Sequence, residues 1–141
     1  MSKYRIKKEA KFEAAHQIVG HQDPLKGGPG KCSRLHGHSY HIAVCVEAPV
    51  LMPIGFVVDF YWIGSVLKDL VDKWDHRNLN DLPDFEHLNT TAENIAGVVA
   101  HHVTEHIKVL IRAGHAPKGT RVVYGECRET ESTYSRWYPE D

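Results

Sequence analysis

Cysteine is scarce in this sequence, and its spacing excludes the frameworks that cysteines usually form. The three residues, Cys32, Cys45 and Cys127, contain no C-x-x-C pair. An odd and widely spaced set argues against a disulfide-stapled fold and indicates reduced thiols.

An excess of charge of one sign and long apolar runs are also missing. The formal net charge is −1 with the histidines neutral, so nothing indicates nucleic acid or an anionic membrane as a partner. No apolar run approaches membrane-spanning length, and the charged opening MSKYRIKK lacks the apolar segment of a signal peptide. We therefore expect a cytoplasmic protein. Its 141 residues are expected to form one domain, over 1–141.

Histidine, in contrast, is abundant, with eleven residues, and it is the commonest metal ligand in proteins. His36 and His38 are two residues apart and share one face of a predicted strand, because side chains alternate along a strand. His16 ends an earlier segment of the same alternation. The apolar positions that predict these two strands are Ala10, Phe12 and Ala14, then Tyr40, Ile42, Val44 and Val46.

Three histidines on neighbouring strands predict a metal site. Three imidazoles without a thiolate suit zinc, although copper, iron or nickel would accept the same residue types. A catalytic zinc site typically takes three protein ligands and keeps a fourth position open. We predict that His16, His36 and His38 bind Zn²⁺ in this way. The alternative, that each is a satisfied polar strand residue, suits one histidine better than three.

Cys32 is the candidate functional thiol. It stands four residues before His36, between Lys31 and Arg34, and nearby cations favour the thiolate form of a cysteine. The alternative is an inert thiol, which is the expectation for Cys45 and Cys127.

Two acidic residues are further candidates for a functional role. Asp75 precedes His76 at the end of a predicted helix, and a carboxylate beside an imidazole orients it for general acid/base work. The alternative is a polar helix C-terminus, where the dipole favours histidine. Glu126, in the apolar run 121–126, could accept two hydrogen bonds from an amidine-like pair of N–H groups on a ligand. The alternative is an exposed strand position.

The expected element order is β-β-α-α-β-β, an α+β fold with an antiparallel sheet and both helices on one face. The other face of the sheet needs cover, so we expect an oligomer. Asp59 should cap the first helix, and Thr90-Thr91-Ala92-Glu93 has the form of a capping box that opens the second, which Gly114 closes. The expected ranges are strands at 3–15, 36–48, 56–58, 121–127 and 132–138, and a first helix at 60–74.

Six features occur in a characteristic order along the chain. They are F-E-A-A-H at 12–16, C-S-R-L-H-G-H-S-Y at 32–40, G-F-V-V-D-F at 55–60, D-H-R-N-L-N-D at 75–81, T-A-E-N at 91–94 and Glu126. Through them the chain resembles the 6-pyruvoyltetrahydropterin synthase/6-carboxytetrahydropterin synthase family over nearly its whole length. The resemblance implies the tunnelling fold (T-fold), in which β-β-α-α-β-β subunits assemble into a barrel, usually a homohexamer built as a dimer of trimers.

The resemblance also implies roles for the candidate residues. Zn²⁺ would be bound by His16, His36 and His38, and Cys32 would be the catalytic thiol, with Asp75 and His76 completing a proton-transfer set. Glu126 would anchor a pterin ring through its 2-amino group and N3–H, with Thr91 and Glu93 helping to bind the substrate. After Glu126 stands Cys127, where threonine is usual in the family.

The spacing C-x-x-x-H-G-H over 32–38 resembles the carboxy synthases of bacteria and archaea, whereas animal pyruvoyl synthases carry a longer interval. It favours a zinc-dependent lyase that converts 7,8-dihydroneopterin triphosphate to 6-carboxy-5,6,7,8-tetrahydropterin, acetaldehyde and triphosphate, in 7-deazaguanine (queuosine) biosynthesis. Four alternatives stay open: triphosphate elimination to the pyruvoyl product, aldolase-like cleavage to a 6-hydroxymethyl pterin, a bare metallohydrolase, and a non-enzymatic zinc- or pterin-binding assembly.

Overall fold

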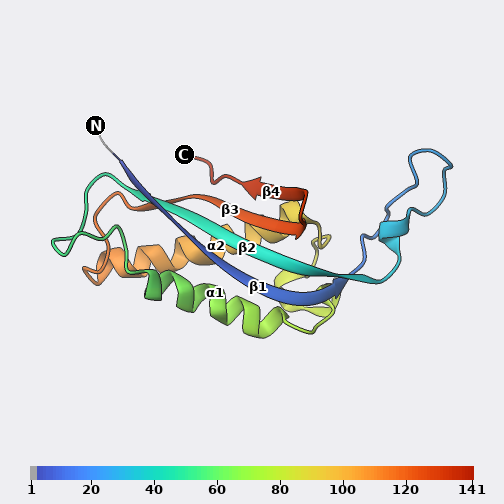
Figure 1. Ribbon diagram of the computed structural model, residues 1–141, viewed down its shortest axis with the longest axis horizontal. Coiled ribbons are helices and arrows are strands. Elements are labelled where there is room, and N and C mark those ends of the chain that lie inside the picture. Colours follow the sequence, from blue (N-terminus) through green and yellow to red (C-terminus); the bar gives the residue numbers. More distant parts are fainter. Residues whose placement is uncertain (1–2) are drawn as a thin grey trace.

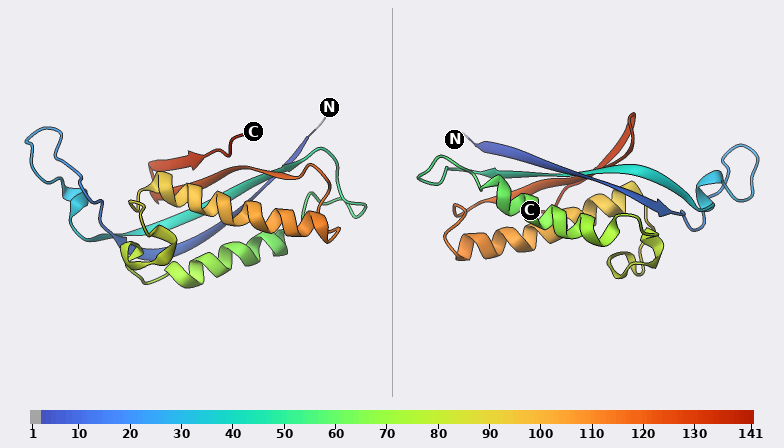
Figure 2. Two further views of the ribbon diagram at one scale, coloured as in Figure 1. Left: turned by 180° about the vertical axis from the view of Figure 1, so that it is seen from behind. Right: turned by 60° about the horizontal axis from the view of Figure 1, so that its bottom comes forward.

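The computed structural model describes residues 3–141, and its elements follow the predicted order. One antiparallel sheet, ordered β1-β2-β3-β4, carries two helices on one of its faces (Figure 1 and Figure 2). The predicted α+β fold is confirmed. The main elements are β1 (Tyr4–His16), β2 (His36–Ala48), α1 (Phe60–Trp74), α2 (Ala92–Arg112), β3 (Arg121–Thr130) and β4 (Thr133–Trp137), with short 3-10 turns η1 (Lys31–Ser33), η2 (Leu79–Asp81) and η3 (Pro83–Phe85).

The hydrophobic core lies between the sheet and the two helices. On β1 and β2 the even-numbered side chains face the helices, and Phe12 stacks on Tyr40 with ring centroids 4.9 Å apart. Trp74, from the last turn of α1, contacts the edge of Phe12. The helices contribute apolar stripes that include Ile63, Leu67 and Leu70 from α1 and Ile95, Val99, Val103 and Ile107 from α2. Over residues 3–141 neither helix is long and apolar enough to cross a membrane.

The first helix is capped as predicted, and the second begins differently. Asp59 accepts a hydrogen bond from the backbone N–H of Tyr61. The predicted capping box would make Thr90 the first cap, but the cap of α2 is Thr91, whose hydroxyl accepts from the N–H of Asn94 at 3.2 Å. That part of the prediction is wrong, because Thr90 is fully buried and its polar groups bond elsewhere.

Residues 56–58 do not form the predicted short strand. The carbonyl of Phe56 closes a turn with the N–H of Met52, and the two valines that follow are buried in the core. Burial against the helices therefore explains their apolar character without sheet pairing. At the other end of the chain, β3 runs to Thr130, three residues further than predicted.

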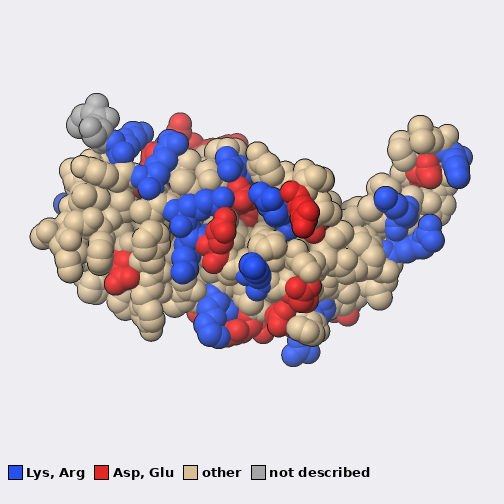
Figure 3. All heavy atoms as spheres, viewed as in Figure 1, with Lys and Arg blue, Asp and Glu red and all other residues tan. Residues whose placement is uncertain are grey.

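The face of the sheet turned away from the helices carries ion pairs (Figure 3). Glu47, 3% exposed, accepts hydrogen bonds from Lys3, Arg5 and Arg121 at 2.8–3.2 Å. The hydrogen bond from Arg5, followed by those from Lys3 and Arg121, lowers the pKa of Glu47 to about 2. Because charged side chains lie on this face of the sheet, the face does not by itself require a second copy of the chain to cover it. The oligomer stays a prediction.

Two features of the sheet shape the region around the histidines. Pairing between β2 and β3 ends at His41 opposite Arg128, so the first residues of β2 pair only with β1. The connection between β1 and β2, which contains residues 21–30, extends beyond the end of the sheet (Figure 1).

Candidate active site

The three predicted ligands converge at one end of the sheet. His16 ends β1, His36 begins β2, and the two are direct cross-strand partners. His38 follows on the same face of β2, and the ring centroids of the three imidazoles lie 4.6–5.1 Å apart. Among the described residues they form the one cluster of three or more potential ligand atoms, all within 4.8 Å of one another.

Backbone carbonyls determine which nitrogen of each ring is free. The Nδ1 of His16 lies 2.7 Å from the carbonyl oxygen of Thr90, and the Nδ1 of His36 lies 2.7 Å from that of Arg34. A carbonyl can only accept, so each Nδ1 carries the hydrogen and each Nε2 keeps a free lone pair. The two Nε2 atoms nevertheless lie 3.0 Å apart.

Two lone pairs at that distance fit a cation between them. Nitrogens bound tetrahedrally to one zinc ion at 2.0–2.1 Å lie about 3.3 Å apart. Burial lowers the pKa of His16 to about 4, despite the hydrogen bond to Thr90, and burial also lowers the pKa of His38. At neutral pH both rings are therefore neutral and able to bind a metal. The donor set fits a zinc ion.

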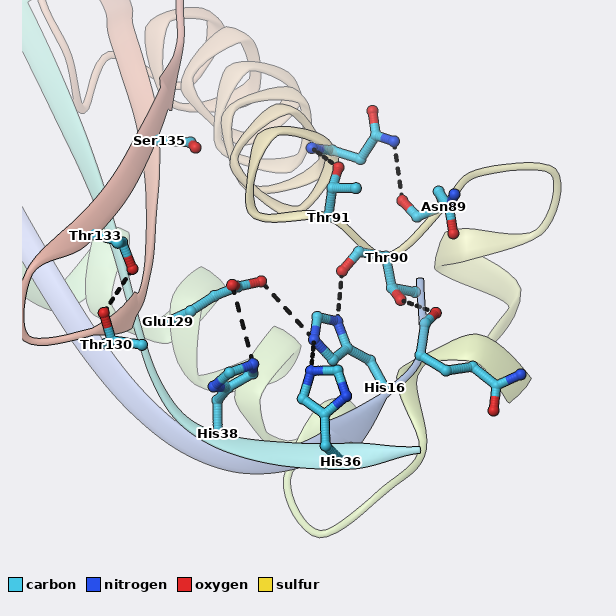
Figure 4. Close-up of polar contacts among 12 residues, drawn as sticks. His16, His36, His38, Asn89, Thr90, Thr91, Glu129, Thr130, Thr133 and Ser135 are labelled. Atoms are coloured by element: carbon cyan, nitrogen blue, oxygen red, sulfur yellow. Dashed lines mark hydrogen bonds and ion pairs between the residues drawn. The ribbon is translucent and has the colours of Figure 1, made fainter. Parts of the chain in front are cut away.

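A carboxylate that the sequence reasoning missed completes the cluster. Glu129 is the second-to-last residue of β3. It points its two carboxylate oxygens at His16 and His38, and each oxygen lies 3.9 Å from an Nε2 atom (Figure 4). Its side chain is 24% exposed, and burial, followed by the charge of Glu93, raises its pKa. It is a partly buried acceptor at the mouth of the metal site.

Glu126, the acidic residue chosen from the sequence, lies on the opposite face of the sheet. It is 4% exposed and accepts hydrogen bonds from Arg136 at 2.7 Å and Lys7 at 3.3 Å. Burial alone would raise its pKa, but the bonds to Arg136 and Lys7 outweigh it and hold the pKa below its usual range. Both its oxygens are already paired, and the structure does not bring it to the histidines.

The sequence also contained a signal that points to Glu129. The unusual Cys127 after Glu126 contrasts with Glu129-Thr130, a glutamate followed by the threonine that the family pattern expects. Glu129 is on the same face of β3 as Cys127, which is buried in the core.

Cys32 lies in η1 and, half-buried, lines a cavity of about 550 Å³ together with the three histidines. Thr91 and Glu93 line the same cavity, and their role in substrate binding stays a prediction. Their side chains are engaged there, since the Thr91 hydroxyl caps α2 and Glu93 accepts from the hydroxyl of Ser135 at 3.0 Å. Lys31 adds one cation to the lining.

Asp75 and His76 form the predicted dyad. The carboxylate of Asp75 accepts from the Nδ1 of His76 at 2.9 Å and from the backbone N–H of Glu13 at 2.9 Å. The bond to Glu13, followed by that to His76, lowers the pKa of Asp75. His76 has a φ of 57°, and its side chain is 79% exposed.

The dyad and the thiol do not share a cavity in the single chain. His76 lines a separate hollow with Ala15, Ser39 and His38, and Cys32 does not contribute to it. The predicted set of thiol, carboxylate and imidazole is therefore not assembled within one chain.

Comparison with known proteins yields one family. A family profile described as 6-pyruvoyl tetrahydropterin synthase matches residues 5–138. A 6-carboxy-5,6,7,8-tetrahydropterin synthase of Bacillus subtilis is 30% identical over 138 residues, which cover 96% of this chain and 86% of the relative.

Other relatives carry different activities in their names. A 6-pyruvoyl tetrahydrobiopterin synthase of Dictyostelium discoideum is 33% identical over 90 residues, covering 60% of this chain and 67% of the relative. A dihydroneopterin monophosphate aldolase of Pyrococcus furiosus is 32% identical over 105 residues, covering 74% and 79%. The solved structure of Caenorhabditis elegans 6-pyruvoyl tetrahydropterin synthase, 22% identical, shares the fold with a TM-score of 0.73 over 99% of this chain and 98% of that one.

Proposed function

Because the chain belongs to the 6-pyruvoyl tetrahydropterin synthase family, we propose that it is a zinc-dependent lyase acting on 7,8-dihydroneopterin triphosphate. With water, the substrate would be converted to 6-carboxy-5,6,7,8-tetrahydropterin, acetaldehyde and triphosphate, for 7-deazaguanine biosynthesis. The observation that carries the proposal is the convergence of three imidazoles, one thiol and the Glu129 carboxylate on a single cavity.

The interval between Cys32 and His36 supports the carboxy product, as does the B. subtilis relative that covers almost the whole chain. The pyruvoyl and hydroxymethyl products remain the alternatives, because relatives of similar identity are named for those activities. A purely metal-binding role would not need a thiol and a free carboxylate in the same cavity.

His16, His36 and His38 would hold the zinc ion through their Nε2 atoms. When bound, zinc supplies a Lewis acid that acidifies the hydroxyl groups of the substrate side chain. Cys32, in the same cavity, would take up a proton from a side-chain carbon as general base.

Glu129 takes the ring-binding role that the sequence assigned to Glu126. Its carboxylate lies in the metal-site cavity and accepts no hydrogen bond among the described residues. The contacts to the Nε2 atoms of His16 and His38 are 3.9 Å long. A carboxylate has two acceptor oxygens, which suit the 2-amino and N3–H donors of a pterin. Thr91 and Glu93 would contribute the adjacent wall.

Asp75 and His76 would act in the assembled protein. Asp75 holds the Nδ1–H of His76, which leaves the exposed Nε2 able to exchange a proton. We propose the barrel-shaped homohexamer, a dimer of trimers, as the assembly that brings this dyad of one copy to Cys32 of another. β1 and β4 are the outer strands of the described sheet, and a neighbouring copy could pair with the edge of β4 and with the edge of β1 before Glu13, where β1 begins to pair with residues 76–78.

Product identification tests the reaction. Zinc-loaded protein would be incubated with dihydroneopterin triphosphate, and the products would be identified by mass spectrometry. We expect 6-carboxytetrahydropterin and acetaldehyde; a pyruvoyl or hydroxymethyl pterin would replace the proposed product by one of the alternatives. Cys32→Ala should lose turnover and keep its zinc, whereas the double variant His36→Ala/His38→Ala should lose the zinc itself.

A further inference from the structure

The chain leaves the sheet directly after His16. At the next residue, Gln17, a side-chain amide makes the backbone hydrogen bonds that a neighbouring strand would make within the sheet. The backbone N–H of Gln17 donates to the Oδ1 of Asn80 at 2.9 Å, and the Nδ2 of Asn80 donates to the carbonyl of Gln17 at 2.9 Å. Asn80 lies in η2, which follows α1. Both backbone groups of the residue next to His16 are therefore held by one asparagine.

The same asparagine holds the residue that orients the His16 ring. Thr90 is fully buried, and its hydroxyl donates to the Oδ1 of Asn80 at 3.1 Å. The carbonyl of Thr90 is the group that accepts from the Nδ1 of His16 at 2.7 Å. The main chain beside His16 and the residue whose carbonyl lies behind its ring thus share one partner. Figure 4 shows the carbonyl of Thr90 directed at the His16 ring.

We propose that Asn80 is a positioning residue for the metal site, acting through Thr90 and Gln17 on His16. By fixing the distance between the β1 terminus and the Thr90 carbonyl, it keeps the hydrogen of His16 on Nδ1 and the lone pair of Nε2 directed at the other two histidines. Groups that hydrogen bond to metal-binding histidines set ring orientation, and their loss typically weakens metal affinity by about 10–100-fold. The inference rests on the metal-binding part of the proposed function and not on the substrate.

A second asparagine offers a matched control. The side chain of Asn89 makes the same pair of hydrogen bonds with Val19. It accepts from the N–H of Val19 at 2.9 Å and donates to the Val19 carbonyl at 2.8 Å. Among the described residues, the Thr90 hydroxyl hydrogen bonds to Asn80 and to the carbonyl of Gln17, and not to the side chain of Asn89. Asn89 holds the same segment two residues further from His16, and it is joined to Thr90 by the peptide bond but not through the Thr90 hydroxyl.

The test measures zinc affinity by competition with a chromophoric chelator, on purified protein without substrate. Asn80→Ala and Thr90→Val should each weaken zinc binding by about 10–100-fold. Thr90→Ser, which keeps the hydroxyl, should restore affinity close to that of the parent protein, and Asn89→Ala should change it much less than Asn80→Ala. Because the two residues act through one network, the double variant should lose less than the product of the two single losses.

A second readout uses metal-free protein. Long-range ¹H–¹⁵N spectra report which ring nitrogen of His16 carries hydrogen. We expect the Nδ1–H form alone in the parent protein and in Thr90→Ser, and a mixture of both forms in Asn80→Ala and Thr90→Val. Should Asn80→Ala fail to fold, as judged by thermal unfolding, the pair of Thr90 variants decides the question.

Unchanged zinc affinity and an unchanged tautomer in folded Asn80→Ala or Thr90→Val would overturn the proposal. An equal loss in Asn89→Ala would also overturn it, because stiffness of the segment would then explain the effect. If the parent protein binds zinc but makes no carboxypterin, the proposed reaction fails and this inference stands. If it binds no zinc, the role of Asn80 at a metal site is overturned, and the tautomer measurement then shows only whether Asn80 orients His16.

Discussion

The Nε2 atoms of His16 and His36 lie 3.0 Å apart, although backbone carbonyls hold the hydrogen of each ring on Nδ1. Both Nε2 atoms are therefore acceptors, and neither has a hydrogen to donate to the other. This arrangement costs free energy unless a cation or a proton lies between them, so the fold keeps the two lone pairs ready for a ligand that it does not itself supply.

The first prediction concerns the pH dependence of stability in metal-free protein. The folded-state pKa of His16 is lowered to about 4 by burial, whereas the unfolded value is 6.5. Between these values the unfolded chain binds more protons, so the free energy of unfolding should fall as the pH decreases from 6.5 towards 4. Urea titrations at several pH values would measure this slope, and His16→Gln should reduce it. A slope of the opposite sign would show that the ring is charged in the folded state.

The second prediction separates the two glutamates of β3. Glu126→Gln removes the charge between Lys7 and Arg136 and should lower the free energy of unfolding by about 2 kcal/mol, with little change in pterin affinity. Glu129→Gln should leave stability nearly unchanged or raise it, because a partly buried charge is lost, and should weaken pterin binding. Denaturant unfolding and fluorescence titration with neopterin would measure both. Loss of pterin affinity in Glu126→Gln alone would restore the assignment made from sequence.

The third prediction concerns the hydroxyl of Tyr40. The residue is fully buried, and over residues 3–141 this oxygen has no hydrogen-bond partner. Removing an unsatisfied buried hydroxyl while keeping the ring should stabilise the metal-free protein by about 1 kcal/mol, because the ring would still stack on Phe12. Thermal unfolding of Tyr40→Phe measures this, with Tyr40→Leu as the control that loses the ring as well. A clear destabilisation by Tyr40→Phe would reveal a partner for the hydroxyl.

The fourth prediction concerns the close approach of β3 to α2. A Cβ on Gly125 would overlap the carbonyl oxygen of Ala96 and lie 2.8 Å from the N of Ala100. Neither backbone can yield without separating the helix from the strand, so Gly125→Ala should destabilise the protein by about 3 kcal/mol or more. Gly97→Ala is the control, since the three atoms nearest to its Cβ would all belong to the Trp137 ring, at 3.4 Å or beyond. Equal stability of the two variants in denaturant titrations would contradict the prediction.

The sequence by itself determined the local parts of this protein. Strand alternation placed His36 and His38 on one face, and helical spacing with Asp59 as cap predicted α1 over its observed range. These features depend on backbone periodicity and on contacts between neighbours in the chain, so they can be predicted without knowledge of the fold.

The tertiary structure decided which residues share a site. Glu126 and Glu129 are both acidic strand residues, but partners distant in sequence, Lys7 and Arg136, occupy the first and leave the second facing the histidines. Thr90 lost its expected role as a helix cap because the ring of His16, 74 positions away, needs its carbonyl. Local patterns cannot choose between such positions, because the choice depends on which long-range partner satisfies each buried polar group.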